Sequence, residues 1–110
     1  MSVKVLITRT VPGDKGRQML QLFREMRSLA TAQPGYISGE TMKSNDRPDV
    51  FLVISTWHTA EDWTRWYNSL QRREIQQQID DLLGEPTEYR IYEPLVGGII
   101  PDFEARAPVD

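Results

Sequence analysis

The chain has 110 residues, a length typical of one domain, and a formal net charge of −3 at pH 7. This acidic balance does not attract a phosphate backbone, and the lysines and arginines are scattered among acids, so nucleic acid is not an expected partner. Cysteine is absent, which excludes disulfides, thiolate chemistry and cysteine-ligated metal. The N-terminus leads into a strand pattern without an apolar stretch long enough for a signal peptide or membrane span, so we expect a cytoplasmic protein with no membrane partner.

Residues 3–11 predict the first strand, because their apolar members alternate as they do in a strand with one buried face. Arg9 interrupts that face near its end. A turn at residues 12–14 ends the strand, and Asp14 is available as the N-cap of a helix. This helix is amphipathic, because apolar residues recur at i, i+3, i+4 and i+7 spacing between residues 19 and 30.

Two strands joined by a short loop come next. Pro34 and Gly35 end the helix, and the strand over residues 36–43 has weak alternation and an internal Gly39, which predict a bulged course. The loop is too short for a crossover helix, so the strand over residues 50–57 should run antiparallel to its predecessor. Both faces of this third strand are apolar, with Phe51, Val53 and Trp57 on one and Val50, Leu52 and Ile54 on the other.

The last third of the chain predicts an interrupted helix and a final strand. Thr59 is the expected N-cap, with acids in the first turn, and an aromatic stripe follows it. The apolar stripe then changes phase, which predicts two helical pieces with a break near residues 71–74. Gly84 is the expected helix stop, and alternation resumes in a strand over residues 87–95.

Elements in the order β-α-β-β-α-β predict an α+β domain over residues 1–95, of the ferredoxin-like class with an antiparallel sheet. Both helices would cover one sheet face, which leaves the other apolar face exposed in a monomer. We therefore expect a homodimer with C2 symmetry, in which the two sheets pack face to face. Residues 96–110 are typical of a tail, whose few apolar residues suggest packing on the partner subunit or over a pocket mouth.

The segment over residues 55–69 carries a more specific pattern, namely a strand ending in Trp57, a capped helix start with acids, and Trp66-x-x-Ser69. Together with a Gly-aromatic step at residues 35–36, it resembles the antibiotic biosynthesis monooxygenase family. The resemblance implies a dimeric α/β barrel with a pocket between helices and sheet. It also implies a small aromatic ligand, such as a phenol, quinol or polyketide intermediate, whose deprotonated form reduces dioxygen without a cofactor. The protein would bind the ring, stabilise its anion and exclude water.

Trp66 is the first candidate catalytic residue, since it matches the family's pocket tryptophan and offers an indole face and an N–H donor. The alternative is that Trp66 only fills the core, together with Trp63 on the same stripe. Thr8 and Arg9 fall where the family often places a polar pocket residue. Arg9 could pair with an anionic substrate, unless its side chain leaves the strand end for solvent.

Further candidates are three tyrosines and the single histidine. Tyr67, Tyr89 and Tyr92, with Trp63, are candidate substrate-binding residues, although such tyrosines are often core residues with a solvated hydroxyl. His58 is a candidate base, because histidine exchanges protons near neutral pH. Its place directly before the expected cap equally fits an exposed loop residue.

A haem-degrading branch of the same superfamily requires an axial histidine ten residues beyond the tryptophan that matches Trp66. That position is Gln76 here, and the first-strand asparagine of that branch is replaced by Thr8. One histidine and no cysteine also make no ordinary zinc or iron site. Haem degradation is therefore disfavoured, and we expect no cofactor and no metal.

Two hypotheses from different classes remain open at the level of the sequence. In the first, the protein is a cofactor-independent monooxygenase, an oxidoreductase that acts on a small aromatic compound. In the second, the dimer is a non-catalytic module that binds an apolar ligand, for example in a stress response. No constellation of acid, base and nucleophile compels catalysis, so the sequence leaves open whether the protein is an enzyme.

Overall fold

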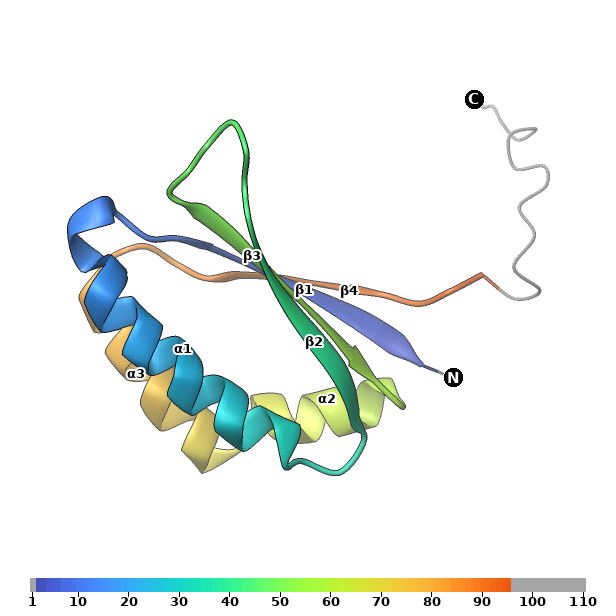
Figure 1. Ribbon diagram of the computed structural model, residues 1–110. Coiled ribbons are helices and arrows are strands. Elements are labelled where there is room, and N and C mark those ends of the chain that lie inside the picture. Colours follow the sequence, from blue (N-terminus) through green and yellow to red (C-terminus); the bar gives the residue numbers. More distant parts are fainter. Residues whose placement is uncertain (1, 96–110) are drawn as a thin grey trace, which may run out of the picture.

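The computed structural model describes residues 2–95, which form a four-stranded sheet with helices packed on one face (Figure 1). The expectation about residues 96–110 lies outside this part of the chain. In chain order the elements are β1 (Val3–Thr10), a 3-10 turn η1 (Gly13–Lys15), α1 (Gly16–Thr31), β2 (Tyr36–Lys43), β3 (Val50–Trp57), α2 (Ala60–Tyr67), α3 (Leu70–Leu83) and β4 (Glu88–Tyr92). The predicted α+β order is confirmed, with its second helix divided in two. No helix within residues 2–95 combines the length and apolarity that a membrane crossing requires.

The sheet has the strand order β2-β3-β1-β4, and all of its neighbouring strands are antiparallel. This is the arrangement of the ferredoxin-like split βαβ fold. In β2 the pairing shifts by one residue between Tyr36 and Ser38, so the predicted irregularity lies at Ile37 rather than at Gly39. Gly39 has a different role, because a Cβ atom there would collide with the Tyr36 hydroxyl.

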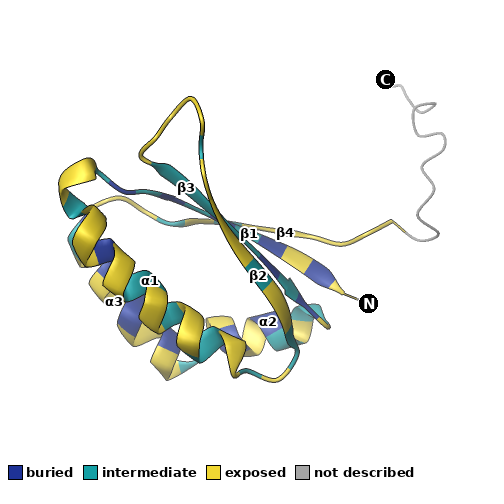
Figure 2. Ribbon diagram, viewed as in Figure 1, coloured by how far each residue is buried: buried dark blue, intermediate teal, exposed yellow. Residues whose placement is uncertain are grey.

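The two faces of the sheet have different surroundings. In β1 the buried residues alternate with more exposed ones, and the buried set, ending in Arg9, faces the helices (Figure 2). The opposite face carries Leu6 beside Ile54 and Thr8 beside Leu52. All four of these residues are partly exposed, because no element within residues 2–95 covers this face. The prediction that the third strand has two apolar faces is thus confirmed.

Helix boundaries follow local capping chemistry. Thr59 caps α2 as predicted, since its Oγ1 accepts a hydrogen bond from the Asp62 amide at 3.0 Å. The prediction that Asp14 caps the first helix is wrong, because Asp14 lies within η1 and the N-cap residue of α1 is Lys15. The break between α2 and α3 also lies earlier than residues 71–74. Ser69 is the N-cap of α3, and its Oγ accepts a hydrogen bond from the Arg72 amide at 3.2 Å.

The core consists of two apolar clusters. The first joins the sheet to α2 and contains Val3, Val5, Ile7, Trp57, Trp63 and Trp66; the second joins α1 to α3 and contains Val11, Met19, Ile75, Ile79 and Leu83. Met26 on α1 packs against both clusters. The first cluster therefore holds α2 against the sheet, the second holds α1 against α3, and Met26 links the two.

Candidate functional site

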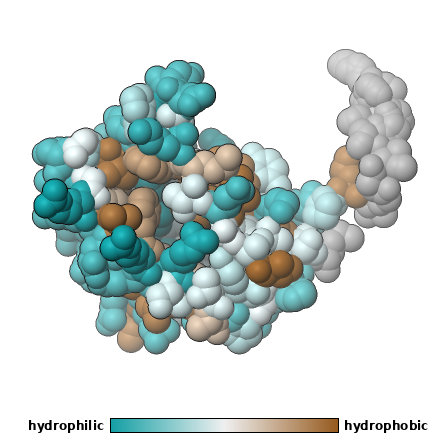
Figure 3. Space-filling view, in the orientation of Figure 1, coloured by the Kyte–Doolittle hydropathy of each residue, from teal (hydrophilic) through white to brown (hydrophobic). Residues whose placement is uncertain are grey.

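An interior cavity of about 300 Å³ lies between α1, α2 and the helix-facing side of the sheet. Its walls are mostly apolar and include the aromatic residues Phe23, Tyr36, Trp57, Trp63 and Trp66. Figure 3 shows apolar side chains gathered in the recess between α1 and the strands, with hydrophilic side chains around them. A concave, mostly apolar cavity with a few polar groups is the usual form of a small-molecule site.

Trp63 and Trp66 reach this cavity from the same stripe of α2, and both are buried. Trp63 makes an edge contact with Trp57, with ring centroids 5.8 Å apart. The indole of Trp57 is fixed in turn by a hydrogen bond from Nε1 to Ser55 Oγ at 3.1 Å. Within residues 2–95 Trp66 Nε1 has no hydrogen-bond partner. Every fully buried side-chain nitrogen there has one, so the Trp66 N–H must reach accessible space, which the cavity provides. Trp66 therefore belongs to the core and to the cavity wall together.

Arg9 stays inside the protein instead of turning out to solvent, with only 4% of its surface exposed. Its Nε donates to Thr87 Oγ1 at 3.2 Å, and its Nη2 donates to Gln76 Oε1 at 3.0 Å. Burial lowers the pKa of the Arg9 guanidinium, an effect that Tyr89 opposes and the nearby charge of Arg72 reinforces. The cavity thus has a positively charged group on its sheet side.

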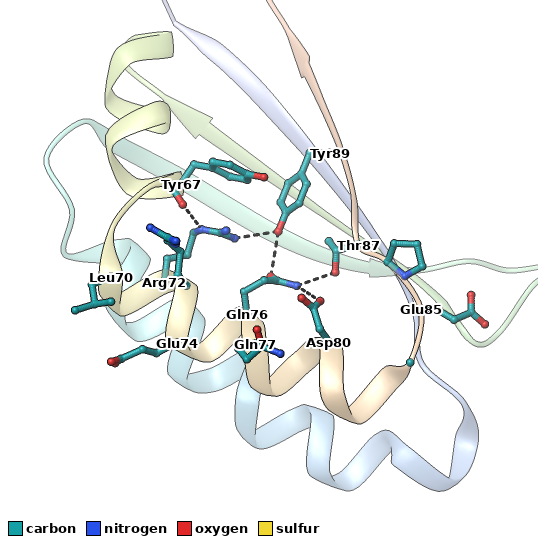
Figure 4. A pocket seen from close by; sticks show the side chains of 13 residues that line it. Tyr67, Leu70, Arg72, Glu74, Gln76, Gln77, Asp80, Glu85, Thr87 and Tyr89 are labelled. Atoms are coloured by element: carbon teal, nitrogen blue, oxygen red, sulfur yellow. Dashed lines mark hydrogen bonds between the residues drawn. The ribbon is translucent and has the colours of Figure 1, made fainter.

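Arg72 supplies a second buried guanidinium from α3 and is 6% exposed. Its Nε donates to the Tyr67 carbonyl oxygen at 2.7 Å, and its Nη1 donates to the Tyr89 hydroxyl at 2.9 Å (Figure 4). The guanidinium also lies over the Tyr67 ring, 4.3 Å from its centroid. These three contacts fix the position of the charge.

Gln76 connects the two arginines. Its Oε1 accepts from Arg9 and from the Tyr89 hydroxyl, each at 3.0 Å. Its Nε2 donates to Asp80 Oδ1 at 2.9 Å and to Thr87 Oγ1 at 3.0 Å (Figure 4). A primary amide has two donor hydrogens and two acceptor lone pairs, so its capacity is fully used. Gln76 therefore acts as a structural amide at the position where the haem-degrading branch has its ligand.

A larger groove, of about 840 Å³, lies on the other side of this network along α3 and β4. Arg72 and Tyr89 line both the groove and the interior cavity. Arg72 and Tyr89, two of the hydrogen-bonded side chains in Figure 4, thus lie between the polar groove and the mostly apolar cavity. The cavity between α1, α2 and the sheet is the better candidate for ring binding, because its walls are mostly apolar and rich in aromatic side chains.

The structure brings four of the predicted site residues to this cavity, namely Trp63, Trp66, Arg9 and Tyr89. The other four predicted site residues do not line the cavity. Thr8 and Tyr92 lie on the uncovered face of the sheet, where they pair with Leu52 and Lys4. His58 is exposed in the link between β3 and α2, and Tyr67 borders the outer groove.

Arg72 and Gln76 were not predicted as site residues from the sequence. Both lie on the buried stripe of α3, which runs through residues 72, 75, 76, 79 and 83. Two polar residues on an otherwise apolar helical stripe were the signal that could have identified them. Within residues 2–95 no group of three or more acidic or histidine side chains could hold a metal ion.

Comparison with known sequences places these features in a family. The sequence model of the antibiotic biosynthesis monooxygenase family matches residues 2–78. Protein SchA of Streptomyces halstedii is 26% identical over 73 residues, which are 66% of this chain and 19% of that protein. A 42.8 kDa protein in the whiE locus of Streptomyces coelicolor is 27% identical over 67 residues, 61% of this chain and 17% of that protein. The match thus spans less than a fifth of either relative.

Solved structures show the same fold. A putative antibiotic biosynthesis monooxygenase from Nitrosomonas europaea superposes with a TM-score of 0.76 at 19% identity, covering 87% of this chain and 92% of that one. SnoaB from Streptomyces nogalater, described as a cofactor-independent oxygenase, superposes with a TM-score of 0.74 at 15% identity, covering 84% and 91%. The family match extends over most of the domain, and the fold agrees with it. The chain belongs to the antibiotic biosynthesis monooxygenase family.

Proposed function

We propose that the protein is a cofactor-independent monooxygenase that oxidises a small aromatic compound inside the cavity. One observation supports the proposal above all: a single cavity is lined by Trp63 and Trp66 and by the buried guanidinium groups of Arg9 and Arg72. Apolar walls of this kind bind a ring, and fixed cations stabilise the anion that the ring forms on losing a proton. Membership of the family supports the reaction type.

The proposed reaction needs no external electron donor. Two guanidinium charges lower the pKa of a bound phenol, so its O–H proton leaves for solvent. The phenolate then gives two electrons to dioxygen, one after the other, and a new C–O bond forms at a ring carbon. After this peroxide takes up a proton, the ring carbon loses its hydrogen as a proton, the O–O bond breaks and water leaves. A quinone remains, with one oxygen atom of O₂ in the product and the other in water.

Oxygen consumption tests the proposal. Incubation with naphthols and hydroquinones, in the presence of a chelator, should give oxygen uptake that Trp66→Phe reduces by about tenfold or more, because the variant loses the indole N–H. Arg17→Gln is the control, since Arg17 is exposed on α1 outside the cavity, and it should retain full activity. Absence of uptake across a broad panel of phenols and quinols would contradict the proposal.

A second candidate function is ligand binding without chemistry. Glu40 is the only carboxylate on the cavity wall within the described residues, and His58 lies outside the cavity, so no strong base is placed for proton transfer. Tight binding of aromatic ligands without oxygen consumption across the same panel would decide in favour of this function.

We also propose that the protein acts as a homodimer joined through the uncovered sheet face. Leu6, Leu52 and Ile54 form an apolar strip on this face, and Met42 beside Leu52 is nearly half exposed. A second copy of the same face would bury this strip symmetrically.

A further inference from the structure

The wall of the interior cavity is cationic although the protein as a whole is acidic. Arg9 and Arg72 reach the cavity from the buried side, and the exposed Arg24 and Arg27 border it on α1. Among the described residues, Glu40 is the only carboxylate on this wall. The whole chain carries a net charge of −3. Four guanidinium groups against one carboxylate therefore concentrate anions at a site where the average surface would repel them.

The two buried arginines have only neutral partners among the described residues. The ion pairs there are Arg65 with Asp62 and Arg90 with Glu88, both with an exposed arginine. Each buried guanidinium uses two N–H groups in hydrogen bonds to hydroxyl, amide or carbonyl oxygens, and a guanidinium has five. Burial lowers the pKa of Arg9, and the charge of Asp80, which accepts a hydrogen bond from Gln76, opposes this effect without forming a salt bridge to Arg9. A buried cation without a directly paired carboxylate is costly, and an anion bound in the cavity would offset that cost.

The spacing of the two charges is fixed by the protein itself. Three consecutive hydrogen bonds lead from Arg9 to Gln76, from Gln76 to Tyr89 and from Tyr89 to Arg72. Like charges repel each other, and this chain of neutral groups holds them at the same side of the cavity. Both guanidinium groups are thereby held in place beside the cavity before a ligand binds.

We infer that the ligand of this cavity is an aromatic carboxylic acid with one or two rings. Its carboxylate lies between Arg9 and Arg72, and its ring lies against Trp63 and Trp66. A carboxylate is planar and has two oxygens with about four acceptor sites, which match two guanidinium forks, whereas a phenolate has a single oxygen. This inference rests on the proposed function only where it names the substrate, which would carry a phenol hydroxyl on the ring carbon next to the acid, so that the same two guanidinium groups act on both.

The size limit follows from the volume of the cavity. An apolar cavity of about 150 Å³ binds benzene, so one of about 300 Å³ holds a bicyclic compound, whereas by the same scaling four fused rings need more room and would extend past its exposed rim into solvent. The expected ligand class is therefore that of the benzoates and naphthoates.

Calorimetric titration under nitrogen tests the inference without turnover. The probes are 2-naphthoate, naphthalene-2-carboxamide as its neutral counterpart, and pyrene-1-carboxylate as a four-ring acid. The acid should bind about tenfold to a hundredfold tighter than the amide, because its carboxylate forms charge-assisted hydrogen bonds. Pyrene-1-carboxylate should bind more weakly than 2-naphthoate.

Arg9→Met and Arg72→Met should each weaken binding of 2-naphthoate by at least about tenfold. Arg17→Gln is the matched control, because Arg17 is exposed on α1 outside the cavity, and it should bind like the unmodified protein. Thermal unfolding is measured for every variant. Should a methionine variant fail to fold, Arg9→Lys and Arg72→Lys keep the charge without the planar fork and should show intermediate affinity.

Equal affinity for acid and amide would overturn the inference, as would binding that no substitution of Arg9 or Arg72 changes or a four-ring acid that binds as tightly as 2-naphthoate. Oxygen uptake with 1-hydroxy-2-naphthoate is measured separately. Selective acid binding without any uptake supports this inference and contradicts the monooxygenase proposal. Uptake with neutral naphthols but no preference for acids supports the monooxygenase proposal and overturns this inference.

Discussion

A single amide, that of Gln76, holds together the polar side of the candidate site. Its carbonyl oxygen accepts from Arg9 and Tyr89, and its nitrogen donates to Thr87 and Asp80. Buried groups left without partners cost more than an average hydrogen bond contributes, so the loss of one amide affects several residues at once.

Gln76→Ala should therefore lower the free energy of unfolding by about 2–3 kcal/mol, because it removes partners from Arg9 and Tyr89 in a buried environment. The neighbouring Gln77→Ala is the matched control. Gln77 bonds Asp81 at 3.0 Å on the exposed side of the same helix, so its loss should cost less than about 0.5 kcal/mol. Urea unfolding of both variants measures the difference, and equal losses would contradict the role assigned to Gln76.

Asp62 predicts a pH dependence of stability. Hydrogen bonds to its carboxylate from Arg65, at 2.9 Å, and from the Thr59 side chain hold its pKa below the usual value. Because the pKa of Asp62 is lower in the folded state, its ionised form stabilises the fold at any pH above the pKa in the unfolded state, about 3.9. This contribution is lost as the pH falls through the pKa in the folded state. The stability difference between the protein and Asp62→Asn should thus shrink in acid. Urea titrations over a pH series measure it, and a difference independent of pH would refute the assignment.

The break between α2 and α3 positions Arg72, one of the four arginines on the cationic wall of the cavity. Ser69 begins α3 by capping the Arg72 amide, and the Arg72 side chain returns to the last residue of α2 through the Tyr67 carbonyl oxygen. Arg72 therefore belongs both to the N-cap of α3 and to the cationic wall of the cavity.

Ser69→Ala should reduce stability by about 1 kcal/mol, the usual cost of losing an N-cap side chain. Ser69→Asp keeps a capping oxygen and places a negative charge at the positive helix terminus, so it should retain most of the stability. Thermal unfolding of the two variants compares these effects. Equal destabilisation by alanine and aspartate would show that the cap does not position this helix.

The strands and the capped start of α2 could be predicted from the sequence, because they depend on local periodicity and on Thr59. The aromatic stripe with Trp63 and Trp66 was visible for the same reason. Arg72 and Gln76 were not identified, because their role depends on hydrogen bonds to Tyr89 in β4. Tyr89 lies 17 residues from Arg72 and 13 residues from Gln76 in the sequence. Such a contact is set by the packing of α3 on the sheet, and helical spacing reveals only that the two polar residues face inward.

The same limit explains the two candidates on the wrong side of the sheet. Thr8 is adjacent to Arg9 in the sequence, but neighbouring residues of a strand point to opposite faces. Tyr92 shares the face of Thr8, because it pairs with Lys4. Alternation was sufficient to separate Thr8 from Arg9, whereas the face of Tyr92 required the pairing register.

At the scale of the whole molecule, the uncovered sheet face predicts the oligomeric state. Leu52→Glu and Ile54→Glu place charges within the apolar strip, so each should convert a dimer into a monomer. Ser28→Glu on the exposed surface of α1 is the control and should leave the dimer intact. Light scattering coupled to size exclusion measures the mass. A monomeric unmodified protein, or a dimer that survives both charge substitutions, would contradict sheet-to-sheet assembly.

The central claim is that the cavity performs oxygen transfer to an aromatic ring that serves as its own reductant. The most direct test is mass spectrometry of the product formed from 1-hydroxy-2-naphthoate under ¹⁸O₂, with a chelator present and no added reductant. We expect a quinone that contains one ¹⁸O atom from dioxygen. The unmodified protein and Arg17→Gln should form it in full yield, and Trp66→Phe and Arg9→Met in strongly reduced yield. A product without ¹⁸O, or the same yield from all four proteins, would contradict it.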